Sequence, residues 1–255
     1  MNVAGKVALI SGAAEGLGKA FTIKLLKKQA KAVGILDIQQ EMGEVTKKQL
    51  NSEYGEDKVH FIKCDVTDKV QLEEAFGNVK DRFGQIDLVC NNAGIANESK
   101  WEKMLEINLT AVMRGSLLAQ KYMDQENGGS GGVLVNVASM AGIEPVPFSP
   151  AYAASKHGVI GLSRSLATNP LFVSNGIRVN ALCPAFARTA ILYGNEPYGF
   201  TKEHLASIMK KFKILPVSIV AEAFMKLVEE DRNGHVMRVT GSKGIDLQTY
   251  KTAPL

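Results

Sequence analysis

The sequence is poor in cysteine and histidine. Its 255 residues include only three cysteines, Cys64, Cys90 and Cys183, which are odd in number and form no CxxC pair. This pattern argues against a disulfide framework and against a cysteine zinc site. The four histidines are scattered, without the spacing typical of metal ligands, so we expect no metal centre. We expect the thiols to be buried and reduced, as in a cytoplasmic protein.

The sequence also lacks a long apolar run and a strong excess of charge. No stretch approaches the ~18 apolar residues that a membrane span needs. The apolar start Val7–Ile10 runs directly into glycines, so we expect no secretory leader. Lysine and arginine total 30 against 26 acidic residues, a net charge of +4. Because the lysine pairs are scattered among acidic residues, we expect no nucleic-acid partner.

Short apolar runs alternate with longer amphipathic stretches. Apolar runs without polar alternation, separated by helices, favour an α/β fold with a parallel sheet. Right-handed crossovers then predict a doubly wound, Rossmann-like sheet of about seven strands, with helices on both faces. The expected strands are Val7–Ser11, Ala32–Asp37, Val59–Lys63, Leu88–Asn91, Val133–Val137, Ile177–Leu182 and Val236–Thr240. The expected helices are Gly16–Lys28, Gln40–Tyr54, Val70–Phe83, Trp101–Met123 and Pro150–Leu166.

One irregular stretch follows the sixth expected strand. It holds several prolines and glycines from Pro184 onward and leads into an amphipathic segment. A long excursion after a strand's carboxyl end is where a substrate lid lies in this architecture. No composition shift marks a linker, so we expect residues 1–255 to form one domain with a lid at about 184–213.

A glycine turn joins the first expected strand to the first helix. Gly12, Gly16 and Gly18 form a GxxxGxG pattern, in which the backbone can approach a pyrophosphate at the helix N-terminus. Asp37 ends the second strand, 19 residues after Gly18, where an acid can bind both hydroxyls of an adenosine ribose. Alternatively, Asp37 only caps the following helix.

Tyr152 and Lys156 are four residues apart, so they share one face of a helix. An ammonium near a phenol favours the phenolate, and we expect Lys156 to lower the pKa of Tyr152 for proton exchange with an alcohol. Ser139 follows the fifth strand at the ligand-binding edge of such a sheet. Taken singly, the two helix residues could be an unrelated surface pair, and Ser139 an ordinary turn residue.

Taken together, these residues resemble the short-chain dehydrogenase/reductase family over nearly the whole chain. The resemblance is carried in order by the glycine turn, Asp37, Asn91–Gly94, Asn108, Ser139, Tyr152 and Lys156. Further segments look like the members that oxidise the 15-hydroxyl of prostaglandins with NAD. These segments are Asn97–Lys103, Glu126–Gly129, Ala154–Gly158, Thr189–Leu192 and Ser242–Ile245.

The resemblance implies catalytic roles for four residues. Tyr152 would be the general acid/base, and Ser139 would hold the substrate oxygen. Lys156 would tune Tyr152 and bind the nicotinamide ribose, and Asn108 would support a proton relay through water. The implied cofactor is NAD. Its implied contacts are Gly12, Gly16, Leu17, Gly18, Asp37, Ile38, Cys64, Asp65, Val66, Asn92, Tyr152, Lys156, Ala187 and Thr189.

The substrate side departs from the pattern at Ser149, where the prostaglandin-oxidising members carry a glutamine that contacts substrate. Serine followed by Pro150 is also a favoured helix start, and capping is the preferred interpretation of Ser149. The implied substrate contacts are Ser139, Ser149, Phe186 and Phe212. A smaller departure is Ser11, where many members carry threonine; we expect its hydroxyl to keep the same contact.

We therefore expect NAD-dependent oxidation of a lipid-like secondary alcohol, such as a prostaglandin 15-hydroxyl, by a cytoplasmic homodimer. One alternative is a different secondary alcohol, namely a steroid, a retinoid or a small aliphatic alcohol. Another is a catalytically silent protein that only binds a dinucleotide. The complete set of Ser139, Tyr152 and Lys156 argues against the silent protein.

Overall fold

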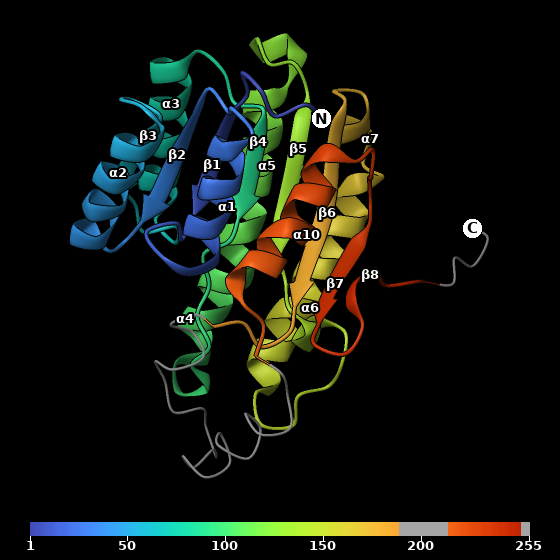
Figure 1. The fold of residues 1–255 in the computed structure, drawn as a ribbon. Helices are drawn as coiled ribbons and strands as arrows, with labels where there is room; N and C mark the ends of the chain where they lie inside the picture. The colour runs from blue at the N-terminus through green and yellow to red at the C-terminus, as the bar shows by residue number, and fades with distance from the viewer. Residues whose placement is uncertain (189–213, 251–255) are drawn as a thin grey trace.

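An eight-stranded sheet forms the centre of the computed structural model, which describes residues 1–188 and 214–250 (Figure 1). The strand order is β3-β2-β1-β4-β5-β6-β7-β8, and β1 to β7 are parallel. The strands are β1 (Val7–Ser11), β2 (Ala32–Asp37), β3 (Val59–Lys63), β4 (Leu88–Asn91), β5 (Gly132–Val137), β6 (Ile177–Pro184), β7 (Val236–Thr240) and β8 (Gly244–Leu247). The order reverses between β1 and β4, and ligands bind such sheets at the carboxyl ends of the strands beside that reversal.

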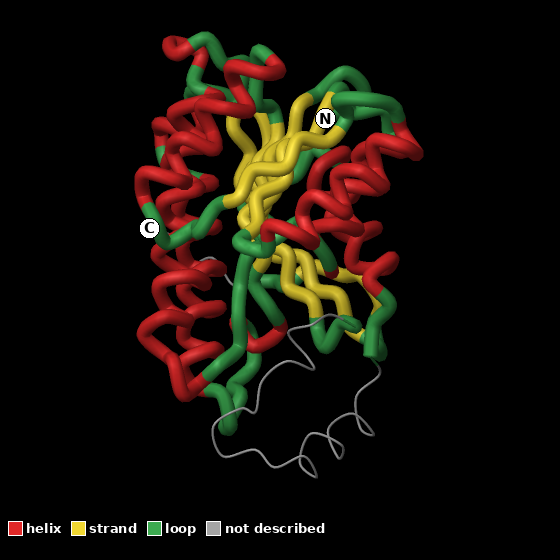
Figure 2. Tube along the Cα trace, turned by 90° about the vertical axis from the view of Figure 1, so that its left-hand side faces the viewer, coloured by secondary structure: helices red, strands yellow, loops and turns green. Residues whose placement is uncertain are grey.

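Helices cover both faces of the sheet (Figure 2). One face carries α1 (Gly16–Lys27), α2 (Gln40–Tyr54) and α10 (Val217–Glu229), and the other carries α3 (Lys69–Phe83), α5 (Ala111–Met123) and α6 (Pro150–Ala167). Phe21 of α1 stacks on Phe224 of α10, with ring centroids 4.4 Å apart. Every residue of β1 and β2 is buried, which explains why these strands show no polar alternation.

The α/β fold class is confirmed, with two local differences from the expected elements. The expected helix 101–123 is divided into α4 (Trp101–Leu105), a π-helical turn (Glu106–Thr110) and α5. The sheet has an eighth strand, because β8 folds back antiparallel onto β7. All residues of β8 are half-buried, so the strand lacks the apolar run that identified the other seven. The helix α7 (Pro170–Val173) is one short turn before β6.

The ends of the expected lid lie next to each other. Of residues 184–213, only 184–188 are among the described residues. The N–H of Arg188 donates to the carbonyl of Leu215 at 3.1 Å, and the N–H of Leu215 donates to the carbonyl of Phe186 at 2.8 Å. The chain thus departs from the sheet and returns to it at one place, beyond the end of β6. Within the described ranges, no helix combines the length and apolarity needed to cross a membrane.

Candidate active site

The glycine turn between β1 and α1 has the backbone expected of an anion site. Gly12 and Gly16 have φ values of 63° and 60°, which glycine adopts without strain. A Cβ atom on Gly18 would lie 2.4 Å from the carbonyl oxygen of Gly12, so the turn packs tightly. Glu15, the N-cap residue of α1, makes no capping hydrogen bond. The first N–H groups of α1, including that of Leu17, therefore have no side-chain cap and suit a pyrophosphate.

Asp37 lies against this turn. Its carboxylate accepts the N–H of Ala14 and the N–H of Gln39, each at 3.0 Å. The helix-cap alternative for Asp37 is wrong, because α2 begins at Gln40 and its N-cap residue is Gln39. The next side chain, Ile38, is 56% exposed, so an apolar surface adjoins the carboxylate.

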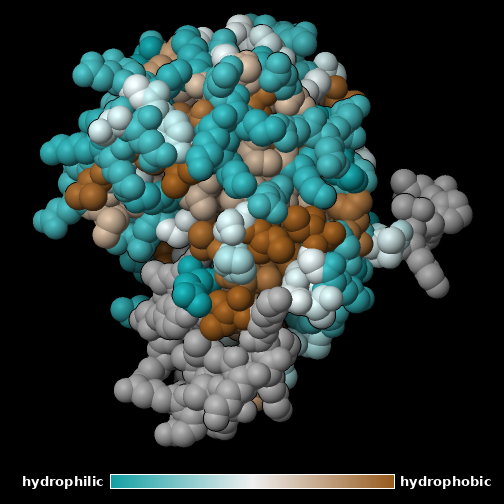
Figure 3. All heavy atoms as spheres, in the orientation of Figure 1, coloured by the Kyte–Doolittle hydropathy of each residue, from teal (hydrophilic) through white to brown (hydrophobic). Residues whose placement is uncertain are grey.

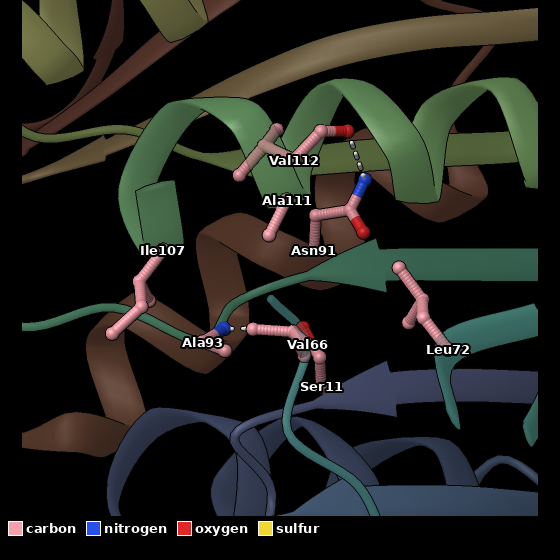
Figure 4. Close-up of a pocket in the computed structure, with 8 residues that line it drawn as sticks. All are labelled: Ser11, Val66, Leu72, Asn91, Ala93, Ile107, Ala111 and Val112. Carbon is pink, nitrogen blue, oxygen red and sulfur yellow. Dashed lines mark hydrogen bonds between the residues drawn. The ribbon is translucent and has the colours of Figure 1, made fainter. Parts of the chain in front are cut away.

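The residues after β3 lie in different surroundings. Cys64 is buried, and burial, with the charge of Asp65, raises the pKa of its thiol to about 12. The carboxylate of Asp65 accepts the N–H and the hydroxyl of Thr67, at 3.0 and 2.7 Å. Val66 borders a cavity of about 10 Å³ between the ends of β1 and β4, where Ser11 and Ala93 also lie (Figure 4). Such a volume holds about one water molecule.

The polar motif after β4 is bound to the glycine turn. The hydroxyl of Ser11 accepts the N–H groups of Asn92 and Ala93, both at 3.1 Å. Serine in place of threonine thus keeps this contact. The side-chain amide of Asn92 donates to the carbonyls of Ser11 and Gly12, at 2.9 and 2.8 Å. Both donors of that amide are used, so a ribose hydroxyl would meet its Oδ1 oxygen.

Asn108 is buried in the π-helical turn. Its Oδ1 accepts the N–H of Ile95 at 2.9 Å, and its Nδ2 donates to the Ile95 carbonyl at 2.8 Å. The same Nδ2 reaches the hydroxyl of Ser155 on α6 at 3.3 Å. The side chain therefore joins the loop after β4 to α6, and the water relay expected of Asn108 stays a prediction.

Ser139, Tyr152 and Lys156 come together at the carboxyl ends of β5 and β6. Ser139 follows β5, and its hydroxyl lies near enough to the Tyr152 phenol to lower the pKa of that phenol. Lys156 lies one turn further along α6, with Nζ 5.8 Å from the centroid of the Tyr152 ring. The same Nζ donates to the carbonyl of Val137 at 3.0 Å, which holds the ammonium beneath the end of β5.

Burial governs the protonation of this pair. Burial raises the pKa of Tyr152, and the nearby Ser139 hydroxyl opposes that rise. Burial also lowers the pKa of Lys156 to about 8. The net shift of the Tyr152 pKa is therefore upward, and the lowering expected from Lys156, which is not among the causes of this shift, stays a prediction. Burial removes water from the phenolate and so disfavours the charged form of the phenol.

The helix that carries Tyr152 has a cap that local sequence did not predict. Ser149 occupies the N-cap position of α6, but its side chain makes no capping hydrogen bond. The carboxylate of Glu98 instead accepts the N–H of Ala151 at 3.1 Å and that of Tyr152 at 2.8 Å. The capping interpretation of Ser149 is wrong for its hydroxyl. No local pattern marks Glu98, because its partners lie 53 and 54 residues further along the chain.

The substrate side of the site is described only in part. Phe186 is exposed and Ala187 is buried where the chain pairs with Leu215, whereas Thr189 and Phe212 lie outside the described residues. A cavity of about 370 Å³ adjoins this place, lined by Arg188, Ile214, Pro216 and Val217. Figure 3 shows apolar atoms gathered over the start of α10, on the same part of the surface.

Comparison with known proteins agrees with this geometry. Residues 6–197 match the family described as short chain dehydrogenase. The chain belongs to this family. Over its full length, this dehydrogenase is 44% identical to 15-hydroxyprostaglandin dehydrogenase (NAD+) from Homo sapiens, of which it covers 98%. The enzyme of the same name from Rattus norvegicus is 43% identical, with the same coverage of both chains.

More distant relatives act on other compounds. This dehydrogenase is 34% identical to 3beta-hydroxysteroid dehydrogenase 2 of Eggerthella lenta, over 75% of each chain. Among solved structures, levodione reductase superposes with a TM-score of 0.82 at 28% identity, covering 94% of this chain and 98% of that one. NAD+-bound xylitol dehydrogenase has a TM-score of 0.83 at 22% identity, with 94% and 100% covered, a likeness in fold.

Proposed function

We propose that this dehydrogenase oxidises the 15-hydroxyl of a prostaglandin or related oxylipin to the ketone, with NAD+ as cofactor. The approach of the Ser139 hydroxyl to the Tyr152 phenol, with Lys156 on the same helix face as Tyr152, is the observation that carries the reaction type. The 44% identity with 15-hydroxyprostaglandin dehydrogenase over the full length supports the substrate class.

The residues around the glycine turn fit NAD+. The uncapped start of α1 and the positive φ of Gly12 and Gly16 support a pyrophosphate there, with Leu17 and Gly18 beside it. Asp37 would accept the adenosine ribose hydroxyls, while the exposed Ile38 offers an apolar contact to the adenine. The remaining proposed contacts are Cys64 through its backbone, Asp65, Val66, Asn92, Tyr152, Lys156, Ala187 and Thr189. Bound NAD+ supplies the acceptor for the hydride that leaves the carbinol carbon.

The protein's own part in the reaction is proton handling. Ser139 would hold the substrate oxygen next to the Tyr152 phenol, and Tyr152 would take the hydroxyl proton as the carbonyl forms. Because burial raises the pKa of Tyr152, the phenol keeps its proton to higher pH, and the fraction of phenolate grows as the pH rises. The Lys156 ammonium, with a pKa of about 8, stabilises the phenolate while it is charged and would bind the nicotinamide ribose. Asn108 holds the surrounding loop and would support a water relay.

Substrate contacts are proposed for Ser139, Ser149, Phe186 and Phe212. The hydroxyl of Ser149 takes no part in capping α6, which leaves it for a substrate hydroxyl. We further propose that residues 1–255 form one catalytic domain with a lid at 184–213, and that the enzyme is a cytoplasmic homodimer. Met113 and Leu117, one turn apart on α5, are 43% and 53% exposed, which supports α5 and α6 as contact surfaces.

The test is NADH formation at 340 nm with a panel of secondary alcohols. Turnover of prostaglandins but not of steroids supports the proposal. The reverse ranking supports a steroid alcohol, the alternative favoured by the relative from Eggerthella lenta. Binding of NADH without turnover of any alcohol would leave only a dinucleotide-binding protein.

A further inference from the structure

The first turn of α6 depends on a single distant side chain. Pro150, its first residue, has no N–H, and the N–H of Ala153 donates to the carbonyl of Ser149 at 2.9 Å. The remaining donors of this turn are the N–H groups of Ala151 and Tyr152. Each of them donates to a different oxygen of the Glu98 carboxylate. Without Glu98, both donors would lose their partner at the point where the helix presents its phenol.

Glu98 ends a segment that is itself anchored on the cofactor side. We call residues 92–98 the strap. At its start, the N–H groups of Asn92 and Ala93 donate to Ser11 beside the glycine turn. In its middle, Ile95 exchanges two hydrogen bonds with the buried side chain of Asn108. The strap therefore runs from the glycine turn to the backbone of Tyr152, with a side-chain anchor in each part.

We propose that Glu98 is a positioning residue for the reaction, acting through the backbone of Tyr152. Hydrogen bonds to a carboxylate are stronger than neutral ones, and a negative charge is favourable at a helix N-terminus. Glu98 thus fixes the first turn of α6, so that the phenol stays beside Ser139 and at its distance from Lys156. This proposal rests on the proposed function, because it assumes that Tyr152 exchanges the proton.

The test compares Glu98→Ala and Glu98→Gln with the unmodified enzyme. A displacement of about 1 Å in a reacting group costs on the order of 10²-fold in rate. We expect Glu98→Ala to lower kcat by about tenfold to a hundredfold, with KM for NAD+ and for the alcohol changed less than about twofold. Glu98→Gln keeps one acceptor oxygen and should lose less. Hydrogen exchange of the Ala151 and Tyr152 amides should accelerate in the same order.

Asp124→Ala is the matched control. Its carboxylate also accepts a backbone N–H, that of Glu126 at 2.9 Å. This contact lies between α5 and the start of β5, at the opposite end of the strands from the site. We expect this variant to lower Tm without changing kcat. If both Asp124→Ala and Glu98→Ala lower Tm but only Glu98→Ala lowers kcat, the loss of activity comes from lost positioning and not from lower stability.

The outcomes distinguish the two proposals. If the unmodified enzyme oxidises an alcohol and Glu98→Ala keeps its kcat, the role of Glu98 is refuted and the proposed function stands. A rise in KM with unchanged kcat would likewise refute positioning of Tyr152. If the enzyme prefers another alcohol to prostaglandins, the substrate proposal fails, and Glu98 is tested with that alcohol. If no alcohol is oxidised, both proposals fail.

Discussion

We expect Glu15→Arg, alone and combined with Asp37→Asn, to weaken or reverse a preference for NAD+ over NADP+. NADP+ carries a phosphate on the adenosine ribose, where Asp37 is expected to accept hydroxyl hydrogen bonds. The structure makes Glu15 the cleaner site to change. Its carboxylate accepts one side-chain hydrogen bond, from Gln39 at 3.2 Å. Asp37 instead accepts the backbone N–H groups of Ala14 and Gln39, and asparagine preserves one such acceptor.

The size of the preference follows from the interactions at Asp37. A hydrogen bond to a charged group contributes about 1.5–3 kcal/mol. NADP+ loses such a bond to Asp37, because its phosphate replaces the hydrogen of a ribose hydroxyl. Repulsion between the phosphate and the carboxylates of Asp37 and Glu15 adds to this loss. Since 1.4 kcal/mol is about tenfold, the unmodified enzyme should favour NAD+ by at least about tenfold to a hundredfold. An arginine at position 15 would replace part of that repulsion by attraction.

The assay is the ratio of kcat/KM for NAD+ to that for NADP+, measured with one alcohol at fixed ionic strength. Glu126→Arg, the same charge change on an exposed residue between α5 and β5, controls for net charge and should leave the ratio unaltered. Thermal unfolding of Asp37→Asn controls for the lost backbone contact. Equal kcat/KM for both cofactors in the unmodified enzyme would refute the assignment of Asp37 to the ribose.

Three further predictions concern the reacting end of the site. Tyr152→Phe should reduce kcat by about 10²–10⁴-fold while NADH binding, followed by fluorescence titration, persists; a variant that retains over a tenth of the activity would contradict a proton-transfer role. Ser149→Gln should raise kcat/KM for prostaglandins relative to other alcohols with little change in Tm, because Glu98 caps α6; a lower Tm with an unchanged substrate ranking would contradict this. Oxidation should accelerate as pH rises toward 8, since only the phenolate accepts a proton and burial raises the pKa of Tyr152. The increase in rate should fade above about pH 8, because Lys156 loses its proton there. Lys156→Arg keeps its charge throughout and should extend the increase to higher pH. A rate of oxidation that falls between neutral pH and pH 8 would contradict this prediction.

Local sequence patterns were sufficient for most of the fold and for the order of the site residues. The ranges of β1 to β4 match the predicted apolar runs, because burial on both faces of a parallel sheet removes polar alternation. Asp37 was expected at the end of β2, and Tyr152 and Lys156 on one face of α6, because strand ends and helical period follow from neighbouring residues. The match of residues 6–197 to the short chain dehydrogenase family has the same origin in residue order.

Other features depended on the tertiary structure. The side chain that caps α6 is that of Glu98 and not the expected Ser149, because the fold brings a carboxylate to that turn from 53 residues away. The antiparallel β8 formed because an existing edge, β7, offered backbone partners to a half-buried segment. The raised pKa of Tyr152 likewise comes from burial beside Ser139 and α6 in the folded protein. Periodicity is a property of adjacent residues, whereas hydrogen-bond partners and the removal of water around a charge depend on which distant segments meet.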